Sequence, residues 1–220
     1  MVAEKKYEKK VIFNGVENIY TRFMTTEDTG TQAPVYDATK ISEVPSLQDF
    51  DGTVEFSEEP IYLSNVIHDN DAIVTAVNIN INAAYLGTGV AEKAQGMVEE
   101  GVGAWSMPTN PRKVPFSLTL IETDKQDGEV IWIFPKATLS PMNVSGTTRN
   151  AGSTNKIPTH TIQALPLTYK TSGEQRKPYF KIDLTTAEAQ AEWDREKLLT
   201  MPVYDSATLA ACKKAVVPEG

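Results

Sequence analysis

The chain has 220 residues, of which 23% are charged and 40% hydrophobic, and it carries a net charge of −8. These values are typical of a folded, soluble protein and exclude collagen-like and low-complexity classes. A single cysteine excludes an intrachain disulfide and a thiolate zinc site, and no stretch approaches the 18 apolar residues of a membrane-spanning helix. The charged first ten residues do not fit a signal peptide, so we expect a protein kept in a reducing cytoplasm.

The charge is unevenly distributed along the chain. Residues 1–10 have a net charge of +2 and are expected to form a charged N-terminal arm. Residues 11–110 hold fifteen acidic residues against three basic ones, a net charge of −12, whereas residues 111–220 have a net charge of +2. The acidic charge of this first half argues against a nucleic-acid-binding site there, because affinity for phosphates needs clustered Lys and Arg. A solvated, solubilising surface is the alternative interpretation.

The first third of the chain contains weak strand signals and one long acidic segment. Short strands are expected at 11–13, 19–23, 38–44, 53–56 and 61–63. Residues 45–60 are acidic and are interrupted by Pro45, Gly52 and Pro60, so we predict a long loop there. Long loops in compact domains are often functional, and subunit contacts are expected from this loop.

The middle of the chain gives the clearest strands. Apolar residues alternate with polar ones from Ile73 to Asn82, which predicts a half-buried strand with an asparagine-rich second face. Residues 90–100 are predicted to form a short helix that ends at Gly101. Residues 116–120 alternate again, and residues 130–134 are apolar on both faces, which predicts a central strand covered from two sides. The Asp127-Gly128 pair between them indicates a hairpin.

The last part of the chain combines a polar loop, two strands and helices. Residues 140–156 are rich in turn-forming residues and are predicted to be a second long loop that contacts other subunits, as the N-terminal arm is also expected to do. Strands are expected at 157–169 and 179–184. The capping box at 185–188 predicts a helix to about Leu199, and 205–215 is a further candidate helix.

Few residues point to chemistry. His68 lies among Asp69, Asn70 and Asp71, which is a possible ligand cluster but also an ordinary polar turn. His160 lies in a strand pattern and is expected to be partly exposed. Cys212 has two lysines beside it, which could activate a thiol, but a packing role is the simpler interpretation. Without nucleophile, phosphate-loop or metalloprotease motifs, we predict no catalytic residues, no metal and no cofactor, and expect that the protein is not an enzyme.

The order of motifs resembles that of major tail tube proteins from bacteriophages with long, non-contractile tails. The resemblance begins with Phe13–Met24, continues through the polar segment 25–30 and Pro34–Ala38, and includes the acidic strand 52–56 and the alternating segment 71–82. The paired segments 116–123 and 130–139, and a Thr-rich segment ending in Ala164-Leu165-Pro166, complete the pattern. The resemblance covers about residues 11–184. The immunoglobulin-like domain at the end of some family members has no counterpart here.

The resemblance implies a mainly β fold, a β-sandwich or split barrel with one flanking short helix. Residues 11–184 would form this tube domain, and 185–220 a helical C-terminal extension. Six copies would form a ring, and stacked rings would form a tube that conducts double-stranded DNA out of the virion. The expected partners are further copies of the chain, the tape-measure protein and other tail proteins, with no membrane. The protein would be assembled in the host cytoplasm and located in the virion tail.

Three other functions remain open at this stage. The chain could be another phage structural component, such as a head decoration, tail completion or baseplate protein. It could be a carbohydrate-binding β-sandwich or adhesin, although it lacks a cluster of exposed aromatic residues, or an enzyme of another type. For the tube function, an acidic wall would keep DNA from adhering. The carboxylates expected to face the lumen or the seam between rings are Asp49, Asp51, Glu55, Glu58 and Glu59.

Overall fold

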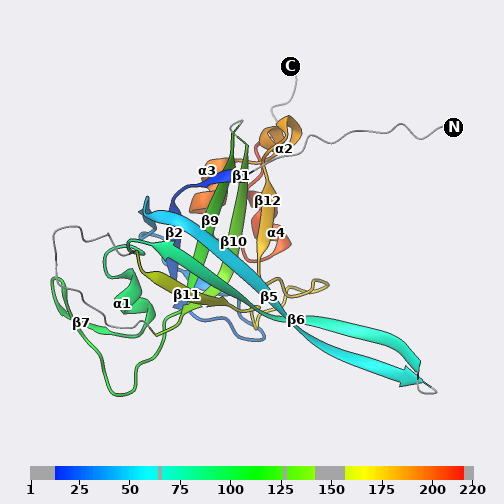
Figure 1. Cartoon of the computed structure of the whole chain (residues 1–220), viewed down its shortest axis with the longest axis horizontal. Coiled ribbons are helices and arrows are strands. Elements are labelled where there is room, and N and C mark those ends of the chain that lie inside the picture. The colour runs from blue at the N-terminus through cyan, green and yellow to red at the C-terminus, as the bar shows by residue number, and fades with distance from the viewer. Residues whose placement is uncertain (1–12, 64–65, 126–127, 142–156, 216–220) are drawn as a thin grey trace.

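The computed structural model describes residues 13–63, 66–125, 128–141 and 157–215 (Figure 1). The fold is mainly β, with a large antiparallel sheet that folds into two layers and with few, short helices. The first layer is formed by β2 (Ile19–Thr26), β9 (Phe116–Asp124), the first half of β10 (Glu129–Leu139) and β12 (Phe180–Asp183). β1 (Phe13–Val16) pairs with β9, whereas β3 (Val35–Tyr36) and β4 (Ser42–Val44) pair with β2.

The second layer continues from the end of β10 through β11 (Thr159–Ala164) and β6 (Val66–Ala83) to β5 (Leu47–Leu63). β10 belongs to both layers. Its pairing with β9 shifts register between Phe134 and Ala137, around Pro135, and a proline at such an irregularity removes no regular ladder hydrogen bond. The expected β-sandwich-like fold is therefore confirmed.

The main core lies between the two layers. Ile79, Ile81 and Ile162 come from the second layer and pack in one cluster with apolar residues of β9 and β10. Val90 and Ala94 of the short helix α1 (Val90–Ala94) belong to the same cluster. The alternation of residues 73–82 thus places Val77, Ile79 and Ile81 in the core, as predicted, whereas Ile73 at the start of the segment is 65% exposed.

A second cluster covers the opposite face of the first layer. Ile121, Ile131 and Ile133 pack there with residues of β12 and of the C-terminal helices. These helices are α2 (Ala187–Glu192), α3 (Arg195–Thr200) and α4 (Ser206–Ala211). Residues 130–134 are therefore covered on both faces, which confirms the prediction from their apolar sequence.

Two segments differ from the sequence-based expectations in the acidic first half. The predicted loop at 45–60 is instead most of β5, which pairs with β6 along its length. Its Asp, Gly and Pro residues disfavour strands in isolation, but pairing with β6 outweighs that preference. The predicted helix at 90–100 is only α1. Gly96 adopts φ +80°, and the chain then forms β7 (Val98–Gly101), which pairs with β8 (Ala104–Ser106).

The predicted helix from 185 to 199 is two helices. Thr186, rather than Thr185, accepts the capping hydrogen bond of α2. The chain leaves the helical conformation at Trp193, which pairs with Lys213, and Asp194 then caps α3. The predicted N-terminal arm at 1–10 and most of the loop at 140–156 lie outside the described residues.

Candidate functional site

The most distinctive surface of the described residues is the polar face of the second layer, on β5, β6 and β11. Three rows of side chains cross these strands. They are Asp49–Asn82–Thr159, Asp51–Asn80–Thr161 and Glu55–Asn78–Gln163. The opposite face of the same strands faces the core, so the alternation of each strand separates an apolar side from a hydrogen-bonded polar side.

Backbone register brings the members of each row together. Asn82 pairs with Asp49 on one side and Thr159 on the other, and Asn80 pairs in the same way with Asp51 and Thr161. In the third row Glu55 lies diagonally across from Asn78, a distance that its longer side chain spans. All three carboxylates are exposed, and the asparagines are half-buried between their neighbours.

The hydrogen bonds of each row run in one direction. The Asn82 amide donates to Asp49 at 2.6 Å, and its carbonyl oxygen accepts from the Thr159 hydroxyl at 2.5 Å. A carboxylate can only accept, so it fixes the orientation of the amide beside it, and the amide in turn orients the hydroxyl. Each row therefore ends in a carboxylate on β5. The result is an ordered face whose charge lies along one strand.

The three strands that form this face supply no Lys or Arg to it. Neither β5, β6 nor β11 has a Lys or Arg anywhere along its length. The carboxylates of the rows therefore accept hydrogen bonds from neutral asparagine amides and keep their negative charge. The arrangement suits a surface that repels anions over a short range and offers them no cation to bind.

β5 is also the end of the sheet. Its only strand partner among the described residues is β6, so its other edge presents backbone N–H and C=O groups. An open edge of this kind can pair with a strand of another chain. Figure 1 shows β5 and β6 continuing as a hairpin that extends away from the two layers.

The five predicted carboxylates are not equivalent. Asp49, Asp51 and Glu55 belong to the rows, whereas Glu58 is exposed further along β5 on the hairpin. The side chain of Glu59 lies outside the described residues. The asparagine, threonine and glutamine members of the rows were not singled out from the sequence as functional residues. The sequence did show that polar residues alternate with apolar ones in 78–82 and again in 159–163. Only the pairing of β6 with β11, which the sequence does not show, brings these polar residues together in rows.

Of the two histidines, the structure describes only the side chain of His160. The side chain of His68 lies outside the described residues. His160 is 2% exposed, which corrects the expectation of partial exposure, because it lies on the core side of β11 where Nε2 donates to the Ala83 carbonyl oxygen. Burial lowers the pKa of His160. Its Nδ1 is buried without a hydrogen-bond partner among the described residues.

Cys212 has a packing role, as predicted. Its side chain is fully buried in the second cluster with Leu198 and Val203. Burial raises the pKa of the Cys212 thiol, which disfavours the reactive thiolate. Among the described residues, no group of three or more His, Cys, Asp or Glu side chains is arranged to hold a metal ion.

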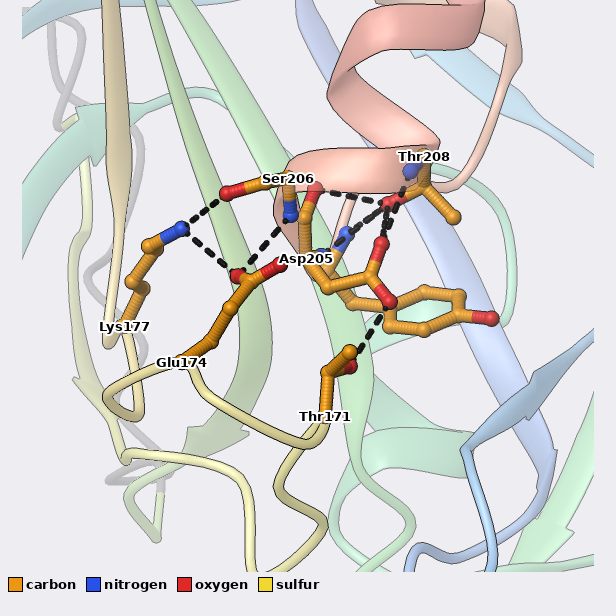
Figure 2. A network of polar contacts seen from close by, with 7 residues as sticks. Thr171, Glu174, Lys177, Asp205, Ser206 and Thr208 are labelled. Carbon is orange, nitrogen blue, oxygen red and sulfur yellow. Dashed lines mark hydrogen bonds and ion pairs between the residues drawn. The ribbon is translucent and has the colours of Figure 1, made fainter.

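A polar network connects α4 to the segment between β11 and β12 (Figure 2). Thr171 donates to Asp205 at 2.9 Å, and Glu174 accepts from Lys177 at 2.9 Å and from the Ser206 backbone N–H at 3.2 Å. Lys177 also donates to the Ser206 hydroxyl. Glu174 thus bridges Lys177 and the first turn of α4. The network therefore has the chemistry of a structural tie.

Neither a scan against models of protein families nor a search of curated proteins finds a significant similarity. Within the described part of the chain, no helix has both the length and the apolar character needed to cross a membrane.

Proposed function

We propose that this chain is a structural subunit of a phage tail tube, in which hexameric rings stack and conduct double-stranded DNA. The observation that carries the proposal is the cation-free polar face of β5, β6 and β11, with its three carboxylate-ended rows. DNA is held by proteins mainly through Lys and Arg on its phosphates. A face that offers hydroxyls, amides and carboxylates instead lets DNA slide past without adhering.

The position of β5 supports assembly into a ring. A second copy that pairs along the open β5 edge would continue the sheet and place its own polar rows beside the first set. Such contacts join two different surfaces of the chain, and repetition of a heterologous contact closes a ring when the rotation allows. In this arrangement Asp49, Asp51 and Glu55 face the lumen, and Glu58 and Glu59 lie near the seam between rings.

The same proposal determines partners and location. The chain would assemble with further copies of itself, with a tape-measure protein in the lumen during assembly and with other tail proteins at the tube ends. Its final location would be the virion tail. Neither a cofactor nor a catalytic residue is needed for this role.

Negative-stain microscopy of the concentrated full chain tests the assembly, and we expect rings or tubes. The proposed role of the lumen carboxylates is tested by one variant that combines Asp49→Asn, Asp51→Asn and Glu55→Gln. These changes keep the acceptor oxygens of the rows and remove three charges per subunit. We expect tubes of the variant to co-sediment with linear double-stranded DNA more strongly than wild-type tubes, and most clearly at low salt, where screening is weak.

A matched control removes three exposed carboxylates elsewhere, by Glu99→Gln, Glu188→Gln and Glu196→Gln. This control should leave DNA co-sedimentation at the wild-type level. Equal effects of both variants would place the rows on the outer wall and contradict the lumen assignment. A chain that stays monomeric at all concentrations and salts would contradict the tube function itself.

A further inference from the structure

A groove opens between the two layers beside the polar rows. Its volume is about 320 Å³, and aromatic side chains dominate its lining, notably Phe50, Trp132 and Tyr179. Gly52 of β5 leaves this space open, because a Cβ built there would meet nothing closer than the Asn78 carbonyl oxygen at 4.0 Å. The layers are therefore incompletely filled at this point.

The charged residues that line the groove are acidic. They are Glu122 and Asp51, and no Lys or Arg of the described residues lines the groove with them. Glu122 accepts from the Trp132 indole at 3.1 Å, which leaves acceptor capacity on its carboxylate for a cation. Lys181 lies over the Trp132 ring from outside the groove, 5.0 Å from the ring centroid, so this aromatic surface already holds one ammonium group. The groove therefore suits a segment that combines apolar and cationic side chains.

An exposed segment with that combination lies between β8 and β9. We define the proline segment as residues 107–113, Met-Pro-Thr-Asn-Pro-Arg-Lys, which contain two cations and no carboxylate. Pro111, Arg112 and Lys113 are all exposed. Arg112 pairs with Glu27 in solvent, whereas Lys113 forms no ion pair with another described residue. Lys113 is thus a cation that a second molecule can engage.

Two prolines limit the freedom of the proline segment before any partner binds. Pro108 and Pro111 each fix φ near −65°, although the segment forms neither helix nor strand. The chain is also fixed directly after the segment, where Val114 donates its backbone N–H to the Ala94 carbonyl oxygen at 3.2 Å. Little conformational entropy is then lost on docking, and proline-containing segments commonly dock on grooves lined by aromatic side chains.

The proline segment cannot enter the groove of its own chain. β9 begins at Phe116, shortly after the segment, and Glu122 lies six residues further along this strand, about 20 Å away. The bond from Val114 to Ala94 holds the segment beside α1, and Figure 1 shows α1 on the opposite side of the fold from β12. A proline segment that occupies the groove must therefore come from a second copy of the chain.

We propose that the proline segment of one copy docks in the aromatic groove of the next copy, with Pro111 against the rings and Lys113 paired with Glu122. Phe50 and Val54 of β5 line the groove, so the docked segment lies beside the open edge of that strand. The contact joins two different surfaces of the chain and can therefore repeat around a ring. This inference rests on the proposed function and identifies a contact between neighbouring subunits of one ring.

An exchange of the two charges tests this contact, with assembly followed by sedimentation and negative-stain microscopy. Lys113→Glu and Glu122→Lys each place like charges opposite each other, so each variant alone should need an about tenfold higher concentration to assemble. An equal mixture of the two variants should assemble at the wild-type concentration, because alternating subunits restore an opposite-charge pair at every contact. A subunit that carries both changes should do the same. Lys40→Glu and Glu188→Lys, two exposed residues outside the groove and the segment, are the matched controls and should assemble normally.

Gly52→Leu tests the groove without a change of charge. The new side chain enters open space, so the subunit should keep its fold by circular dichroism and thermal unfolding, but the filled groove should raise the assembly concentration. Gly30→Leu, at another glycine with open space around it, is the control and should assemble like the wild type.

The outcomes separate this contact from the tube function. If the wild type forms rings but the charge exchange or Gly52→Leu has no effect, or the mixed variants do not recover, the docking contact is wrong and the tube function stands. Open oligomers that respond to the charge exchange but never close into rings or tubes would support the contact and contradict the tube function. If the wild type stays monomeric, both proposals fail.

Discussion

Asp28 and Glu27 are adjacent carboxylates in opposite surroundings. The Asp28 side chain is fully buried and accepts from Lys136 at 2.6 Å and from the Tyr169 backbone N–H at 2.9 Å. Burial alone would raise the pKa of Asp28, but the hydrogen bonds from Lys136 and Tyr169 outweigh it and hold that pKa below its usual value. Glu27 forms an ion pair with Arg112, whose side chain is 87% exposed. Asp28 therefore joins β10 to the segment between β11 and β12, whereas the Glu27–Arg112 pair lies in solvent.

Asp28→Asn is predicted to lower the free energy of unfolding by about 3 kcal/mol, because it leaves the Lys136 ammonium nearly buried without its counter-charge. Glu27→Gln, the neighbouring control, should change it by less than about 1 kcal/mol, since exposed ion pairs contribute little. Urea unfolding at pH 7 measures both. Similar losses for the two variants would contradict the role assigned to the buried pair.

His160 makes stability depend on pH. Burial lowers the pKa of the folded-state imidazole below the value of about 6.5 that applies in the unfolded chain. The unfolded chain then binds more protons than the folded one in this range, so stability is complete above about pH 6.5 and falls as the pH drops toward the folded-state pKa. His160→Gln should keep a donor near the Ala83 carbonyl oxygen and remove this dependence. Thermal unfolding at pH 7.0 and 5.5 measures it, and an equal acid-induced loss in both proteins would exclude His160 as the source.

Alternation predicted the elements whose two faces differ strongly. β6 and β9 were foreseen because their apolar residues recur with the period of a strand, and β10 was foreseen because its residues 130–134 are apolar on both faces. β5 was foreseen only in the short pieces 53–56 and 61–63, because its outward residues are acidic and its sequence contains Gly52 and Pro60, so the register with β6 is what makes it one long strand. The same limit applies to the candidate site. Its carboxylates were predicted, but the amides and hydroxyls that order them come from strands that are distant in sequence.

Gly96 ends α1 for a reason that can be tested. Its φ of +80° is unfavourable for other residues, and a Cβ there would lie 2.3 Å from the Arg112 carbonyl oxygen. Gly96→Ala should therefore cost about 2 kcal/mol or more in the free energy of unfolding. Alanine substitutions at two other glycines separate the effect of the positive φ from the effect of the steric clash. Gly103 has φ +72° with open space around it and should cost about 1 kcal/mol, and Gly101, with neither constraint, should change stability within about 0.5 kcal/mol. A harmless Gly96→Ala would refute this account of the helix end.

At the scale of the whole molecule, the C-terminal helices complete the fold. Leu198 and Leu199 of α3 pack on the face of the first layer that points away from the main core. Arg22 of β2 donates to the Thr200 carbonyl oxygen at the end of the same helix. The first layer is thus covered on both sides, whereas the second layer keeps one face polar and open. This asymmetry separates a polar, solvent-exposed surface from one that is covered by the chain's own helices.

The long β5–β6 ladder has a mechanical consequence. Its hydrogen bonds run perpendicular to the strands, from the pair Leu47–Ala83 near the root toward the tip. Tension applied along the hairpin that draws one strand past the other loads these bonds in shear, so many must yield together. A force that pulls the two strands apart at one end would instead break them one after another. The hairpin is therefore strongest against tension along its own length and weakest against a force that peels its strands apart from one end.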